Sequence, residues 1–297
     1  DTIDFQLSSE HNVVEVSKTV WNANGSVSNG GFLLPFGGGK VALKDTGIIY
    51  YVCEPHSIFG MKGSITVSLP KIGDTYIAKM SGMQEAFPFA GFGTCDIKAV
   101  VIGDTLKLSG SFKNLSGDHT PAAGTGAHIH RGFAGTSGAI SITLNPIIDV
   151  SKKSGSFVAA SNTVVLTADQ KNQLKARELY VNIHTTLAPG GEIRGQLLPE
   201  SDAYFQANLT GDQENPSIMS PGHGSVVAEL IGTKLVISGS AKGLISGVNT
   251  GIRQGGHLHL GFAGQNGGIQ LELKPTLGDS LGTSVQYLAV DNSFDLT

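Results

Sequence analysis

Residues 126–138 read GAHIHRGFAGTSG and residues 255–267 read GGHLHLGFAGQNG, so one short stretch occurs twice, 129 residues apart. The upstream segments agree at the same spacing, because YIAKMSGMQE at 76–85 aligns with FQANLTGDQE at 205–214. A repeat of this length indicates two tandem copies of one domain rather than a solenoid of short units. The fold of most of the chain is therefore the fold of this repeated unit.

The repeat divides the chain into three parts. We place copy one at residues 74–200 and copy two at 203–297, whereas residues 1–70 do not match the repeat and form a separate β region. Residues 168–200 of copy one have no counterpart after the end of copy two. We therefore expect copy two to be incomplete at its C-terminus.

Composition favours an all-β chain. Charged residues make up only 15% of the sequence, and 41 of the 297 residues are glycine, which suits many tight turns better than helix bundles. No apolar run reaches the roughly 18 residues of a membrane span. The net charge of −4 gives no basic surface for nucleic acid. We expect neither a membrane span nor a nucleic-acid partner.

Local patterns specify individual elements. Residues 105–112 and 234–238 alternate between apolar and polar side chains, as half-buried strands do. One short helix is expected near 168–177, because Thr167 and Gln170 form a capping box before a run of helix-favouring residues. The copies are thus predicted to be β-sandwiches, with one helix in copy one.

A group of metal-ligand types lies in the N-terminal region. Residues 50–63 read YYVCEPHSIFGMKG, which places Cys53, His56 and Met61 in one strand-and-loop segment, and His11 lies upstream. Two imidazoles, a thiolate and a weak axial thioether are the ligands of an electron-transfer (type 1) copper site. We expect Cys53 at the end of a strand, and His11 on a neighbouring strand.

This region resembles the plastocyanin-like cupredoxins. The matching stretches are HNVV at 11–14, PFGGGKV at 35–41 and YYVCEPHSIFGM at 50–61. The resemblance implies a Greek-key β-sandwich that carries one electron at a time to or from a redox partner protein. Members of this family have one or two strands before the first histidine, and only ten residues precede His11. We therefore expect the N-terminal strands of the sandwich to be missing.

The ligand loop also contains two large apolar residues, Ile58 and Phe59, close to His56. Two interpretations are open. They pack in the core, or they form an apolar patch on which a redox partner docks, since electron-transfer contacts are small and transient.

The repeated unit resembles the CHRD domain, which is named after chordin. The matching stretches are AHIHRGFAGTSG at 127–138, LYVNIHT at 179–185 and GGEIRGQL at 190–197. The resemblance implies a secreted β-sandwich without a defined activity. Together with type 1 copper it places the chain outside the cytoplasm, in a periplasm, at a cell surface or secreted. Cys95 would then have to be buried, because an exposed thiol oxidises there.

A second candidate metal site lies in copy one. His128 and His130 are two residues apart and so share one face of a strand, and His184 lies in another alternating strand. If the strands are neighbours, three imidazoles converge and can bind Cu or Zn. Alternatively, these histidines only bond the backbone of glycine-rich loops. His257 and His259 repeat the pair in copy two as a weaker candidate, without a third ligand.

Three other polar residues have simpler interpretations. Glu192 and Arg194 share one face of a strand, which predicts an ion pair between them. His119 lies in a loop, and the sequence indicates no partner for it.

Three functions are consistent with these features. The leading hypothesis is an extracytoplasmic copper electron carrier, not an enzyme, with CHRD domains as scaffold or docking modules. The second is a copper oxidoreductase that passes electrons from Cys53 to the histidine site, although Val52 and Glu54 flank the cysteine where a bridging histidine would be needed. The third is a filament or matrix protein that self-associates by strand exchange to complete its domains.

Overall fold

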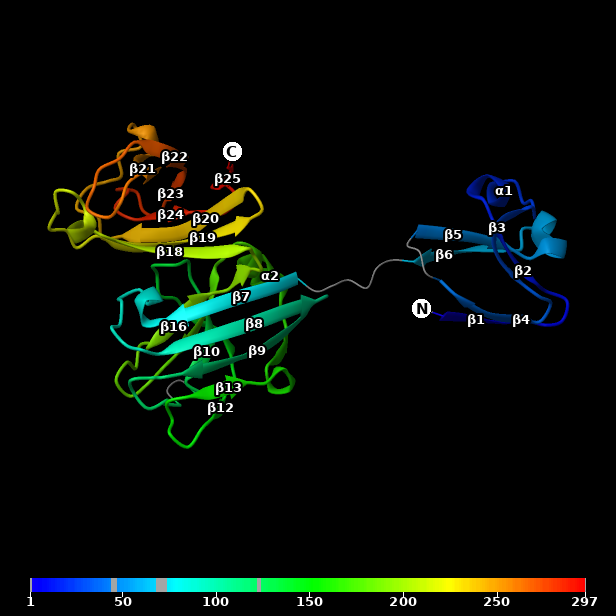
Figure 1. Cartoon of the computed structure of the whole chain (residues 1–297), viewed down its shortest axis with the longest axis horizontal. Helices are drawn as coiled ribbons and strands as arrows, with labels where there is room; N and C mark the ends of the chain where they lie inside the picture. The colour runs from blue at the N-terminus through cyan, green and yellow to red at the C-terminus, as the bar shows by residue number, and fades with distance from the viewer. Residues whose placement is uncertain (1, 44–46, 68–73, 122–123, 297) are drawn as a thin grey trace. The chain divides into compact units, whose positions relative to one another are not determined.

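The computed structural model describes residues 2–43, 47–67, 74–121 and 124–296 (Figure 1). The chain divides into two compact units, Asp1–Ile72 and Gly73–Thr297. Both units consist mainly of antiparallel strands, so the predicted all-β class is confirmed. None of the helices in the described ranges is long and apolar enough to span a membrane.

The described residues of unit 1 form two small sheets. The larger has the strand order β3-β2-β5-β6, and β1 pairs with β4 in the smaller one. A short helix and a 3₁₀ segment complete the unit, whose elements are β1 (Thr2–Gln6), β2 (Val13–Val16), α1 (Lys18–Asn22), β3 (Ser28–Leu34), β4 (Gly38–Ala42), β5 (Gly47–Val52), η1 (Glu54–Phe59) and β6 (Lys62–Val67).

The core of unit 1 is a small apolar cluster on the β2–β5 pair. Val14, Val16 and Val52 are almost fully buried, and Trp21 of α1 packs against them. The sequence did not predict α1. It has only five residues, too few for an apolar period, and it begins where the Ser17 side chain accepts a hydrogen bond from the amide of Val20.

Copy one forms a continuous eleven-stranded antiparallel sheet in unit 2. The main path is β11-β10-β15-β16-β7-β8-β9-β13-β12, with β14 paired to β9 and β17 to β7. Figure 1 shows β7, β8 and β9 side by side. Its elements are β7 (Asp74–Ser81), η2 (Gly82–Gln84), β8 (Thr94–Ile102), β9 (Thr105–Lys113), β10 (Ala127–Arg131), β11 (Ile140–Thr143), β12 (Ile147–Ile148), β13 (Gly155–Phe157), η3 (Ala159–Ser161), β14 (Thr163–Val165), α2 (Ala168–Lys175), β15 (Leu179–Ile183), β16 (Ile193–Gln196) and β17 (Leu198–Pro199).

The predicted helix is confirmed as α2. Thr167 accepts a hydrogen bond from the amide of Gln170, and the Gln170 side chain accepts one from the amide of Thr167, which is a complete capping box. Leu174 anchors the helix in the core of copy one. That core also buries Cys95, as expected.

The strands of copy two follow those of copy one at the same spacing as the sequence repeat. β18 begins 129 residues after β7, and β25 begins 130 residues after β14. Its elements are β18 (Ala203–Thr210), η4 (Gly211–Gln213), β19 (His223–Ile231), β20 (Lys234–Lys242), η5 (Arg253–Gly255), β21 (Gly256–His259), β22 (Ile269–Leu273), β23 (Pro275–Leu277), β24 (Val285–Tyr287) and β25 (Ser293–Asp295).

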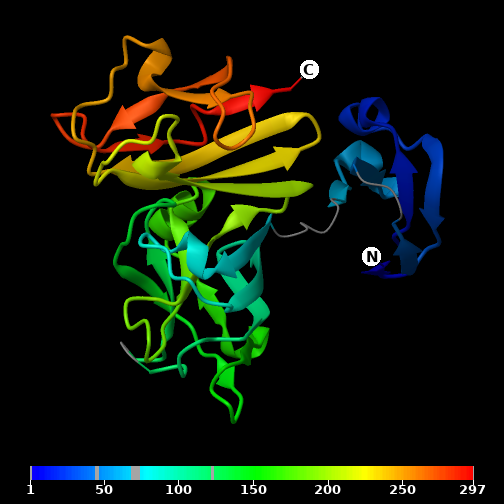
Figure 2. The ribbon, with the colours of Figure 1, turned by 60° about the vertical axis from the view of Figure 1, so that its left-hand side comes forward.

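The two copies pack against each other within unit 2. Figure 2 shows the yellow strands of copy two against the green part of copy one. Ala134 and Leu198 of copy one share an apolar cluster with Val227 of copy two. Beside this cluster, Arg177 donates two hydrogen bonds of 2.9 Å to the buried carboxylate of Glu229. This interface therefore combines apolar packing, a bidentate ion pair and hydrogen bonds such as that from the Ser240 hydroxyl to the Ala134 carbonyl.

Candidate metal centres

The first centre lies at the end of the β2–β5 pair. Cys53 directly follows β5, and η1 then turns the chain so that His56 returns toward it. His11 precedes β2, whose residue Val14 lies opposite Val52 of β5. The strand pairing therefore brings His11 to Cys53 across a sequence separation of 42 residues.

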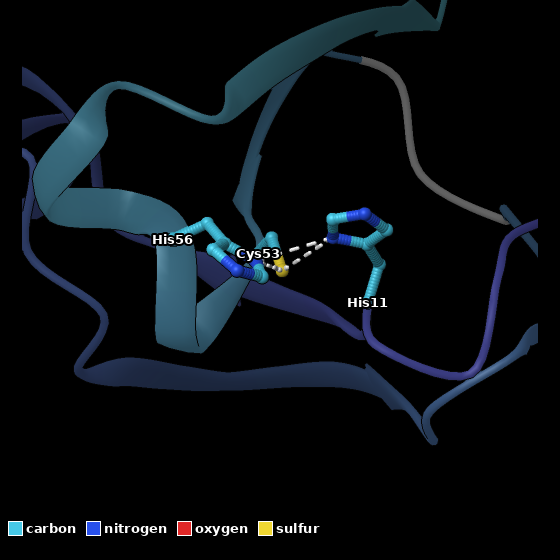
Figure 3. A group of neighbouring side chains, drawn as sticks. All are labelled: His11, Cys53 and His56. Atoms are coloured by element: carbon cyan, nitrogen blue, oxygen red, sulfur yellow. Dashed lines mark hydrogen bonds between the residues drawn. The ribbon is translucent and has the colours of Figure 1, made fainter.

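The three side chains point toward one another (Figure 3). The Nδ1 atoms of His11 and His56 are 3.2 Å apart, and Cys53 Sγ lies 3.6 and 3.3 Å from them. Ligand atoms that share one ion through bonds of about 2.0–2.3 Å lie roughly 3.3–3.8 Å apart. The donor set and its spacing thus fit a single metal ion.

Met61 lines the same pocket as His11 and Cys53. Its backbone closes the loop, because its carbonyl accepts a bond of 3.0 Å from the Cys53 amide and its amide donates one of 3.2 Å to the His56 carbonyl. Met61 as a whole is 41% exposed. The structure therefore places His11, Cys53 and Met61 around one pocket, and His56 lies next to the first two through its Nδ1 atom.

Asn12 ties the two ligand segments together, a role that the sequence analysis missed. Its side chain is buried, accepts a hydrogen bond of 2.9 Å from the Glu54 amide and donates one of 3.2 Å to the Glu54 carboxylate. These bonds join the residue after His11 to the residue after Cys53. Its position directly beside a ligand was the only signal in the sequence.

The apolar residues of the ligand loop do not pack in the core. Ile58 is 71% and Phe59 80% exposed, so the core interpretation is wrong. They leave an apolar surface on the same 3₁₀ segment that carries His56.

The second centre lies in copy one, where β10 pairs with β15. Register places His128 opposite Asn182 and His130 opposite Tyr180, and His184 follows directly after β15. The ring centroids of the three histidines are 5.2 to 5.8 Å apart. Their nitrogen ligand atoms lie within 4.8 Å of one another, and all three residues are buried. β10 and β15 are therefore neighbours, which was the condition for the three imidazoles to converge.

Backbone carbonyls orient two of these rings. His130 Nδ1 lies 2.9 Å from the Gly138 carbonyl, and His184 Nδ1 lies 2.9 Å from the Pro189 carbonyl. Their Nε2 atoms are buried and have no hydrogen-bond partner among the residues that the structure describes. Burial lowers the pKa of both rings, so at neutral pH they are neutral imidazoles. Loop bonding, the alternative interpretation, therefore accounts for one nitrogen of each ring and not for the other.

A stacked chain of side chains fixes the loop that orients His130. The Tyr180 ring stacks on His130, with centroids 5.2 Å apart, and the Arg194 guanidinium lies 3.5 Å from the Tyr180 centroid. Arg194 also donates hydrogen bonds of 2.8 Å to the carbonyls of Phe133 and Thr136. The loop between β10 and β11 is thus held by a buried cation.

The predicted ion pair between Glu192 and Arg194 is wrong. Glu192 instead accepts hydrogen bonds from the amides of Ser116 and Gly117 and from the Thr185 hydroxyl. Both side chains are buried, as expected for one strand face. However, each forms its hydrogen bonds with a different loop.

Two further titratable residues near this centre were not assigned by the sequence. His119 forms a backbone bridge with Thr185, and burial, followed by the nearby His184, lowers its pKa. Glu85 accepts a hydrogen bond of 2.9 Å from Asn182, and burial raises its pKa to about 7. Both lie far from His184 in the sequence, so only the fold reveals their proximity.

In copy two, His257 and His259 repeat the pair with ring centroids 5.6 Å apart. His259 Nδ1 lies 2.9 Å from the Gly267 carbonyl, as His130 does from that of Gly138. The pair is more exposed than its counterpart, and within the described ranges it does not belong to any group of three His, Cys, Asp or Glu ligands.

Comparison with protein families identifies the repeated unit. The CHRD domain model matches residues 76–197 and 205–297, so the chain belongs to the CHRD domain family. No cupredoxin family model matches the chain. No curated protein matches it either.

Proposed function

We propose that unit 1 contains a type 1 copper site and transfers single electrons. We further propose that the CHRD copies are scaffold or docking modules for this unit. The observation that carries this proposal is the convergence of His11, Cys53 and His56 at 3.2 to 3.6 Å. Copper bound there would supply a reversible Cu(I)/Cu(II) couple. Met61 is the candidate axial ligand, because it lines the same pocket.

The apolar surface beside the centre supports docking of a redox partner. Ile58 and Phe59 are exposed next to His56, and electron-transfer partners meet through small, transient contacts. An imidazole ligand next to an apolar contact surface gives a short path for an electron. CHRD membership and a thiolate copper site both favour a location outside the cytoplasm, where the partner would also lie.

The electrochemistry of the copper-loaded chain tests this proposal. We expect a reversible one-electron wave in voltammetry that Cys53→Ser abolishes, because a serine hydroxyl does not supply a thiolate. Cys95→Ala is the matched control, since Cys95 is buried in copy one and should not affect the wave. A wave that survives Cys53→Ser would refute the assignment.

A further inference from the structure

The electron carrier uses none of the buried histidines of copy one. We propose that His128, His130 and His184 bind one divalent transition-metal ion, Zn(II) or Cu(II), independently of the site in unit 1. Three imidazoles are a donor set that both ions accept, with a remaining position for water or another small ligand.

The geometry of the cluster is that of a ligand set. The β10–β15 register brings the three rings together, with ligand nitrogens within 4.8 Å of one another. Ions with bonds of about 2.0–2.1 Å need nitrogens roughly 3.3–3.6 Å apart. Small rotations of the rings about their side-chain bonds would bring the nitrogens from within 4.8 Å to the separation that an ion needs.

The hydrogen bonds of the cluster prepare it for a cation. The Nδ1–H groups of His130 and His184 would donate to the carbonyls of Gly138 and Pro189, which leaves the Nε2 lone pairs directed away from these carbonyls. Metal-bound histidines typically donate their other ring N–H in this way. Buried nitrogens without a partner destabilise a fold, and a bound ion would satisfy both Nε2 atoms.

The loop that orients His130 is itself rigid. A Cβ at Gly138 would collide with the Arg131 carbonyl, and the Gly138 amide donates a hydrogen bond of 3.1 Å to the Tyr180 hydroxyl. Arg194 lies against the Tyr180 ring and donates a hydrogen bond to the Thr136 carbonyl of the same loop. The carbonyl next to His130 is therefore held in place before any ion binds, as a preorganised site requires.

The test measures Zn(II) uptake by the full chain after removal of the first site. His11→Ala combined with Cys53→Ala removes two ligands of unit 1, and we expect this parent to bind one equivalent of Zn(II) and to gain thermal stability from it. His130→Asn and His184→Asn, each added to the parent, can keep the hydrogen bond to the loop carbonyl and remove Nε2. Each should lower Zn(II) affinity at least a hundredfold.

His223→Ala in the same parent is the matched control, because His223 lies in copy two outside the cluster. It should leave uptake unchanged. Electron paramagnetic resonance of the Cu(II)-loaded parent provides a second measurement, with nitrogen couplings from three imidazoles expected. Absence of uptake by the parent, uptake unaffected by both asparagine variants, or couplings from fewer than three imidazoles would overturn the proposal.

Discussion

At the scale of single residues, Asn12 shows how a neighbouring side chain positions a candidate metal ligand. Its side chain makes both of its hydrogen bonds to Glu54, which follows Cys53. The position of His11 relative to Cys53 therefore depends on the buried side-chain amide of Asn12.

Asn12→Ala should lower the free energy of unfolding of unit 1 by about 1 kcal/mol, because the Glu54 amide loses its side-chain acceptor. Denaturant titration of the metal-free chain measures this loss. Asn22→Ala, at the exposed end of α1, is the control and should have little effect. Equal effects of the two substitutions would contradict the role given to Asn12.

Glu85 gives copy one a pH-dependent stability. Burial raises its folded-state pKa from 4.5 to about 7, against the opposing effects of Arg194 and Asn182. Between these values the folded state holds a proton that the unfolded state has released, so stability falls as pH rises through this window. Burial lowers the pKa of His130 and of His184, and these two act in the opposite direction, losing stability as pH falls below about 6.5.

Glu85→Gln separates these contributions, since the histidines are common to both proteins. The stability of the variant relative to wild type should rise by about 3 kcal/mol between pH 4.5 and pH 8. Unfolding titrations at several pH values measure the difference. Glu214→Gln, at the equivalent but exposed position of copy two, should show almost no such change. A flat difference for Glu85→Gln would show that its carboxylate is ionised throughout.

At the scale of elements, the sequence predicted features with a local signal. Alternation located β9 and β20, and the capping box located α2. The helix α1 was missed, because a five-residue helix is stabilised by Trp21 packing on β2 and β5 rather than by its own pattern.

The candidate sites also contain residues that the sequence predicted and residues that it did not. Short spacings and strand periodicity were sufficient to propose both ligand sets, because each ligand type is visible in the sequence. The orienting groups were not predictable. The bonds from Asn12 to Glu54 and the stacking of Arg194 on Tyr180 depend on strand register, and no local pattern encodes that register. The expected Glu192–Arg194 pair failed because amides of a distant loop bind the carboxylate instead.

The cap of α2 provides a test at this scale. Thr167→Ala should destabilise copy one by about 1 kcal/mol, because the Gln170 amide loses its acceptor at the helix N-terminus. Denaturant unfolding measures the loss, and Thr167→Ser, which retains a hydroxyl, should restore most of the stability. Equal losses for alanine and serine would mean that the threonine methyl group, not the cap, is what matters.

At the scale of the whole molecule, the two CHRD copies are coupled by more than their connecting chain. Glu229 of copy two is almost fully buried, and its charge is compensated by Arg177 of copy one. Removal of one partner from such a pair leaves an isolated buried charge, which costs about 3–5 kcal/mol.

Arg177→Met should therefore destabilise unit 2 far more than the double variant Arg177→Met/Glu229→Gln. A double-mutant cycle in denaturant should give a coupling energy of about 2 kcal/mol or more. The surface pair Lys79–Asp96 within copy one is the control, with an expected coupling below about 1 kcal/mol. Additive effects of Arg177→Met and Glu229→Gln would show that the copies do not share this ion pair in solution.

The visible absorption spectrum of the full chain loaded with Cu(II) tests the copper site most directly. If Cys53, His11 and His56 bind copper together, an intense thiolate-to-copper band should appear near roughly 600 nm and disappear on reduction to Cu(I). The band should saturate at one equivalent, whatever else the second centre binds. Stoichiometric copper uptake with only weak absorption in this region would contradict the type 1 site.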